Sequence, residues 1–143
     1  MAIFNKFDCF VQDVAHALHD MNTSTAQTYK VYLTNAAPVR TNTVYGTPVD
    51  LSTANGYTSG GTSIGTITGS QASGVFKFAG GTDPTWTASG GSIGPFQYAV
   101  LYNFTSGTKP LIGWWDNGSP LTVASGQSFT VALDHTNGIL TIT

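Results

Sequence analysis

Charged side chains are scarce in this sequence. Only 8% of its 143 residues are Asp, Glu, Lys or Arg, against about 25% in an average soluble domain. Glutamate is absent, and five basic residues oppose seven aspartates, for a net charge of −2. Such a chain has no basic surface for a phosphate backbone, so we expect no nucleic-acid partner. With 41% hydrophobic residues it is also too apolar to be a disordered charged tail.

The sequence also has little cysteine and no long apolar run. Cys9 is the only cysteine, which excludes an internal disulfide and a multi-cysteine zinc site. No run approaches the roughly 18 apolar residues of a membrane helix. Asn5, Lys6 and Asp8 interrupt the first ten residues, where a secretory signal needs an apolar stretch. We therefore expect that the protein has no membrane partner. We also expect it to be made in the cytoplasm.

Helical periodicity is confined to the start of the chain. From Phe4 to Met21, apolar residues recur mostly at steps of three or four, which predicts one amphipathic helix that ends at the turn-forming residues 22–25. An isolated helix of this length is marginal in water, so its apolar face must be buried. The cover is either the protein's own sheet or a neighbouring subunit. The apolar stripe includes Phe4, Phe7, Phe10, Val14 and Leu18.

After residue 25 the pattern is that of short strands. Threonine is the most frequent residue, and 17 glycines punctuate the chain. Tyr29–Thr34 alternates as a half-buried strand, and Phe96–Phe104 is the best candidate for a central strand. Shorter candidates are Asn42–Tyr45, Thr62–Thr68, Val75–Phe78, Thr85–Ala88, Pro110–Trp115, Leu121–Ala124, Gln127–Leu133 and Ile139–Ile142, with a long polar loop over Val49–Gly61. The Asn-Gly pairs at 117–118 and 137–138 predict two hairpins.

About nine short strands, with turns every 8–12 residues, are typical of an antiparallel sandwich or barrel. We predict a mainly β fold: an antiparallel β-sandwich or barrel-like domain (jelly-roll or immunoglobulin-like) with one N-terminal amphipathic helix. A single domain is expected over residues 1–143. Residues 1–25 would form the helix and turn, and residues 26–143 the β domain.

Residues with catalytic or metal-binding chemistry are few and scattered. His16 and His19 share a helical face and, with Asp13 or Asp20, offer part of a metal site, but a solvated face is the better interpretation because a site needs three or four ligands. Cys9 lies beside Asp8, which disfavours a thiolate nucleophile. The third histidine, His135, is far along the chain. We expect no enzymatic activity, no cofactor and no bound metal.

The tryptophans suggest contact surfaces. Trp114 and Trp115 are adjacent in a predicted strand, so they point to opposite faces, one toward the core and the other toward the surface or an interface. Together with Trp86 and six tyrosines they could also stack against sugars. The interface residues that we predict are Phe4, Phe7, Phe10 and Trp115.

Several stretches resemble a family of small virion proteins of tailed bacteriophages. They are the opening MAIFNKF, the run YKVYLTNAAP at 29–38, TASGGSIGPFQYAVLYN at 87–103, PLIGWWD at 110–116, SFTV at 128–131 and NGILT at 137–141. The resemblance covers most of the chain, with residues 41–80 least similar. The matching residues belong to turns and core, so they specify a fold better than a role.

This resemblance implies a structural protein of the capsid decoration or cement type. The expected partner is the major capsid protein, with self-association most simply as a trimer around a local three-fold axis. The expected location is the capsid surface of the virion, after synthesis in the host cytoplasm. The alternative is a tail or fibre module that binds host-surface carbohydrate through Trp and Tyr.

Overall fold

The computed structural model describes residues 2–23 and 27–143. Short strands dominate it, and one short helix lies near the N-terminus. The elements are β1 (Phe4–Lys6), α1 (Cys9–Ala15), β2 (Tyr29–Thr34), β3 (Thr62–Ser63), β4 (Ile67–Ala72), β5 (Val75–Gly80), β6 (Thr85–Thr87), β7 (Ile93–Asn103), β8 (Leu111–Val123), β9 (Ser128–Thr130) and β10 (Leu140–Ile142).

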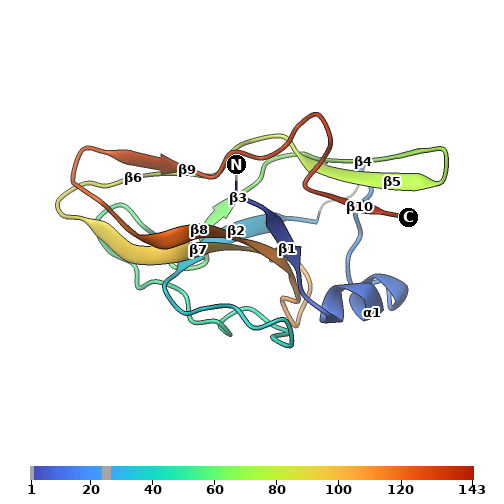
Figure 1. The fold of residues 1–143 in the computed structure, drawn as a ribbon, viewed down its shortest axis with the longest axis horizontal. Coiled ribbons are helices and arrows are strands. Elements are labelled where there is room, and N and C mark those ends of the chain that lie inside the picture. Colours follow the sequence, from blue (N-terminus) through green and yellow to red (C-terminus); the bar gives the residue numbers. More distant parts are fainter. Residues whose placement is uncertain (1, 24–26) are drawn as a thin grey trace.

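The strands form open, antiparallel sheets in two layers. The larger sheet has five strands in the order β1-β8-β7-β2-β3, and two smaller sheets, β10-β5-β4 and β6-β9, lie end to end over one of its faces (Figure 1). All pairings between the named strands are antiparallel. The predicted mainly β, sandwich-like fold is therefore confirmed, and the sheets of the described residues do not close into a barrel.

The main core lies between the two layers. Tyr29, Val31 and Leu33 of β2 point into it, where they meet Phe78 of β5 and other apolar residues of the smaller sheets. Tyr29 and Phe78 pack edge to face, with their ring centroids 5.1 Å apart. This is the alternation that the sequence of β2 predicts, because every second residue of a strand faces the same side.

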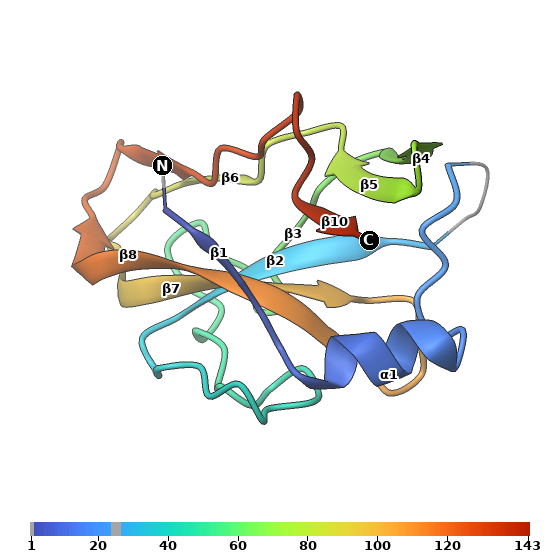
Figure 2. The same cartoon turned by 45° about the vertical axis from the view of Figure 1, so that its right-hand side comes forward.

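The opposite face of the large sheet is also covered, but by a long connection without regular structure. Residues 35–61, between β2 and β3, run beneath the sheet (Figures 1 and 2). A second apolar cluster forms there around Tyr32, Val100, Tyr102 and Leu111. The expectation of a half-buried β2 is therefore wrong: Tyr32 and Thr34, on the covered face, are as deeply buried as Val31 and Leu33.

The predicted helix over Phe4–Met21 is corrected. Residues Phe4–Lys6 form strand β1, which pairs with β8, and the helix spans only Cys9–Ala15. The three-residue spacing of Phe4, Phe7 and Phe10 resembles one helical face. Phe4 of the strand instead contacts Trp115 on one face of the sheet, while Phe7, just after the strand, contacts Trp114 on the other. Pairing with β8 thus overrides the local periodicity. The predicted turn at 22–25 lies partly outside the described residues.

The predicted hairpin at Asn117-Gly118 is also wrong. β8 continues through it and stays paired with β7, with Asp116 opposite Tyr98 and Leu121 opposite Phe96. Residues 117–120 therefore form an excursion within one strand. Gly118 has a φ of +83°, and its N–H donates to the Asp116 carboxylate at 2.7 Å. The residues that favour a turn do form one, as predicted. The turn makes a bulge in β8 because the segments on both sides of it pair with the same strand, β7.

The second Asn-Gly pair does form a turn, and the Gly138 N–H donates to the carbonyl of Asp134 at 3.0 Å. The turn does not join two paired strands, however. It follows β9, which pairs with β6, and precedes β10, which pairs with β5. The predicted hairpin is therefore replaced by a connection between the two small sheets.

Candidate functional site

The bulge in β8 lies beside an apolar groove at the surface. This groove, which we call the β7–β9 groove, lies between Phe96 and Ala99 of β7, Trp115 and Asn117 of β8, and the β9 segment. Its volume is about 200 Å³. It is the candidate ligand site of the fold because it contains the predicted interface residue Trp115.

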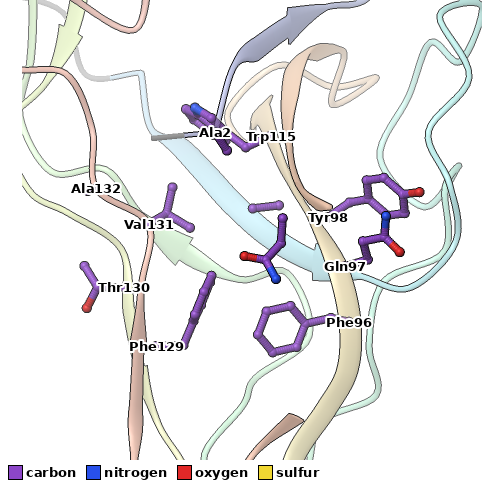
Figure 3. Close-up of a pocket in the computed structure, with 11 residues that line it drawn as sticks. Ala2, Phe96, Gln97, Tyr98, Trp115, Phe129, Thr130, Val131 and Ala132 are labelled. Carbon is purple, nitrogen blue, oxygen red and sulfur yellow. The ribbon is translucent and has the colours of Figure 1, made fainter. Parts of the chain in front are cut away.

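Aromatic rings form the walls of the groove. Phe96 and Phe129 pack edge to face with ring centroids 4.9 Å apart, and Trp115 lies against Phe4 at 4.8 Å. Figure 3 shows Phe129 and Val131 facing Phe96. The side chains of Gln97 and Tyr98 lie on the other side of the β7 ribbon. In a regular strand Tyr98 would lie on the same side as Phe96. The register shift opposite residues 117–120 breaks this alternation of β7 between Phe96 and Tyr98.

The chemistry of the groove is that of a neutral, apolar recess. Thr130 and Asn117 supply hydroxyl and amide groups at its wall. Among the described residues that line it, only Tyr98 is titratable, and its side chain lies on the other side of β7 (Figure 3). Trp115 is 8% exposed, so it offers little ring face for stacking. The groove suits a small apolar side chain or one edge of a neutral ring, and it offers no acid or base for catalysis.

The structure buries most of the predicted interface residues within the protein's own fold. Phe7 is 0% exposed and Phe10 is 2% exposed. Phe10 belongs to the main core and Phe7 to the second cluster, so neither side chain presents surface to a partner in this fold. Phe4 is partly buried against the core and keeps some surface. Trp114 and Trp115 lie on opposite faces of the sheet, as predicted.

Cys9 is held as a thiol. Its Sγ lies 3.6 Å from the carbonyl oxygen of Leu111 and 3.7 Å from that of Asn42. Burial, reinforced by the carboxylates of Asp13 and Asp8, raises the pKa of this thiol to about 12. A nucleophilic cysteine needs the opposite shift, toward a stable thiolate.

The histidines lie apart from one another. His16 caps the end of α1 and is exposed, whereas His19 is buried between Phe10 and Tyr29. Burial lowers the pKa of His19 to about 4, so its imidazole is neutral at pH 7. Its Nε2 has no hydrogen-bond partner and lies 4.0 Å from the Asp13 carboxylate. Across residues 2–23 and 27–143, no three His, Cys, Asp or Glu side chains come together in a metal-binding group.

His135 ties the C-terminal segment to the turn after β5. Its Nε2 lies 2.8 Å from a carboxylate oxygen of Asp83, and its Nδ1 lies 2.9 Å from the carbonyl oxygen of Gly80. The same Asp83 oxygen accepts the backbone N–H of Leu133 at 3.0 Å. These bonds connect residues about 50 positions apart in the sequence, which is a structural role.

Sequence reasoning missed a hydrogen-bond network centred on Asp50 in the loop over residues 35–61. Its carboxylate accepts the hydroxyls of Tyr45, Tyr57 and Ser59 and the backbone N–H of Gly60. The Tyr57 hydroxyl in turn accepts the N–H of Leu33 at 3.0 Å. Burial and the bond to Asp50 raise the pKa of Tyr57 far above its usual value. The signal in the sequence was an aspartate between two tyrosines, in a stretch that is otherwise mostly small or polar.

Comparisons with protein-family models, with curated proteins and with solved structures gave no match for this chain. Within the described residues, no helix has both the length and the apolar character needed to cross a membrane.

Proposed function

We propose that this protein is a non-enzymatic structural component of a tailed-bacteriophage virion, which decorates the outer capsid surface and bridges subunits of the major capsid protein. The observation that carries the proposal is the weakly charged surface. Five basic and seven acidic side chains are distributed over an accessible area of 6992 Å². Contacts made by such a surface depend little on salt, because few exposed charges are there to be screened.

The residue types that perform chemistry in enzymes are used here to hold the fold. Asp50 accepts hydrogen bonds from loop residues, Asp83 and His135 join distant segments, and Cys9 is a half-buried thiol with a raised pKa. This use supports a structural role. The resemblance of the sequence to small virion proteins supports the same role.

Exposed apolar side chains provide contact area near the N-terminal segment. Ile3, which precedes β1, is 80% exposed, and Val11 of α1 is exposed as well. Val39 is also exposed and adjoins Arg40, whose carbonyl accepts the N–H of Asp8. Partial burial of such side chains against a capsid subunit, or between copies in a trimer, would add favourable free energy at each contact. Repetition over a symmetric capsid makes weak single contacts effective through avidity.

The proposal is tested with phage particles assembled without this protein. We expect heads of normal shape that release their DNA at a lower temperature, or after salt shock, than wild-type heads do. Adding the purified protein back should restore the release temperature. Heads without the protein that are as robust as wild-type heads would contradict a capsid-stabilising role.

A second candidate function is carbohydrate binding by a tail or fibre module. The observation that favours it is the aromatic wall of the β7–β9 groove, since aromatic rings are common in sugar sites. The small volume and the low exposure of Trp115 weigh against it. A glycan array separates the two: a sugar ligand whose binding is lost in Phe129→Ala favours the tail module.

A further inference from the structure

Two lysines share one exposed aromatic ring at the end of β7. The Lys30 ammonium lies 3.9 Å from the centroid of the Phe104 ring, and the Lys109 ammonium lies 5.1 Å from the same centroid. Lys109 also lies 5.5 Å from the ring of Tyr45. Phe104 is 39% exposed, which is unusual for an aromatic residue in this chain. We call Lys30, Phe104 and Lys109 the Phe104 patch.

Neither ammonium of the patch has an acidic partner among the described residues. The ion pairs found among the described residues are Arg40–Asp8, His19–Asp13 and His135–Asp83. The carboxylate bonded to Tyr45 is Asp50, whose oxygens already accept hydrogen bonds from other groups. Two of the five basic residues are thus gathered around one ring, although the chain as a whole has a net charge of −2.

The backbone places Lys109 in a conformation that its side chain does not favour. Its φ is +48°, in the left-handed region where a residue with a Cβ is disfavoured. The position closes a turn in which the Lys109 N–H donates to the carbonyl of Ser106 at 2.8 Å. Eleven of the fifteen positive-φ residues described are glycines, so this turn holds a lysine where the chain elsewhere mostly has glycine. Backbone strain of this kind often marks a functional position.

We propose that the Phe104 patch binds an acidic peptide segment of the protein's partner. A carboxylate of the segment would lie beside the ammonium groups of Lys30 and Lys109, and an apolar side chain next to it would cover the exposed part of Phe104. This inference rests on the proposed function, because it assigns the segment to the capsid protein. Charge complementarity selects an acidic ligand. Two ammonium groups are too few for a nucleic-acid backbone, which usually engages a larger basic surface.

The first test measures peptide binding directly. The probe is a fluorescein-labelled peptide of alternating Asp and Leu, and a peptide of alternating Lys and Leu is its opposite-charge control. The variant is Lys30→Gln/Lys109→Gly, in which glycine is compatible with the positive φ and so preserves the turn. The matched control is Lys6→Gln/Lys77→Gln, which removes the same charge elsewhere.

We expect the acidic peptide to bind the wild type and the control alike. Binding to the patch variant should be about tenfold weaker, because each exposed ion pair contributes up to a factor of about five. Equal binding to all three proteins, no binding to any, or a preference for single-stranded DNA over the peptide would overturn the inference.

The second test separates this inference from the proposed function. Heads assembled without the protein are mixed with each variant and then sedimented. Wild type and control that sediment with the heads, with the patch variant left in solution, support both proposals. If all three sediment equally, the patch is not the contact although the capsid role stands. If the wild type does not sediment with the heads, the capsid role fails, and the peptide measurement alone decides on the patch.

Discussion

The two faces of the five-stranded sheet are covered in different ways. Over one face, strands of the smaller sheets contribute apolar side chains, and the contact is maintained by their burial. Over the other face, residues 35–61 form no regular strand, and the carboxylate of Asp50 holds them through directed hydrogen bonds. The strand-covered face should therefore respond mainly to lost volume, and the loop-covered face, which also buries an apolar cluster, should respond to lost hydrogen-bond partners as well.

The largest expected effect is on the strand-covered face. Phe10→Ala removes a ring that is buried in the main core, and we expect it to lower the free energy of unfolding by about 3–5 kcal/mol. Denaturant melts measure the loss, and size-exclusion chromatography reports the oligomeric state. A variant that keeps its stability but no longer assembles would show instead that Phe10 serves a neighbouring subunit.

Removal of the Asp50 carboxylate should affect the loop-covered face. Asp50→Ala leaves the hydroxyls of Tyr45 and Tyr57 and the Gly60 N–H without their acceptor, at an expected cost of about 3 kcal/mol. Amide hydrogen exchange should accelerate over residues 35–61 more than in β5. Asp116→Ala, the same change at an exposed site, should cost less than about 1 kcal/mol. Uniform acceleration throughout the protein would contradict a local role of Asp50 in holding residues 35–61.

Acid should weaken the strand-covered face through His19. The unfolded chain takes up the His19 proton near its ordinary pKa of 6.5, whereas burial lowers the folded pKa to about 4. Stability due to this residue is therefore complete above pH 6.5 and is lost as the pH falls toward 4. Between pH 7.5 and 5 we expect a loss of about 2 kcal/mol. Melts at stepped pH should show this slope in the wild type and in His16→Gln, and a flatter one in His19→Gln.

The smallest expected effect shows whether Lys109 serves the Phe104 patch or stabilises the fold. Lys109→Gly relieves a left-handed backbone conformation, so it should change stability by less than about 1 kcal/mol, in the stabilising direction. Thermal melts of the single variant test this. A clear destabilisation would mean that the contact of Lys109 with Phe104 and Tyr45 supports the loop.

The positions of the strands could be predicted from the sequence better than the pairing between strands. β2 and the centre of β7 follow from alternating and strongly apolar runs, because both patterns are typical of strands, although the alternation of β2 predicts less burial than the structure shows. The spacing of the N-terminal segment does not distinguish one long helix from β1 and α1, because a spacing of three residues fits both a helical face and the two sides of a sheet followed by a short helix. At Asn117-Gly118 the local turn was correct, but only the pairing of both flanks with β7 decides between a hairpin and a bulge.

The candidate site was less predictable than the fold. Trp115 was singled out, but Phe96 and Phe129 meet it only through the packing of strands that are distant in sequence. The Phe104 patch had one local signal, since Lys30 is a charged residue within an otherwise uncharged strand. Its meeting with Lys109 depends on the turn that precedes β8. Contacts between distant segments therefore determine both sites.

Cryo-electron microscopy of the whole virion tests the proposed capsid role. If the protein decorates the capsid, density that fits this two-layered fold should lie on the outer surface of the head, repeated at equivalent positions around local three-fold axes. Density for this fold that is confined to the tail, or absence of the protein from the particle, would contradict that role.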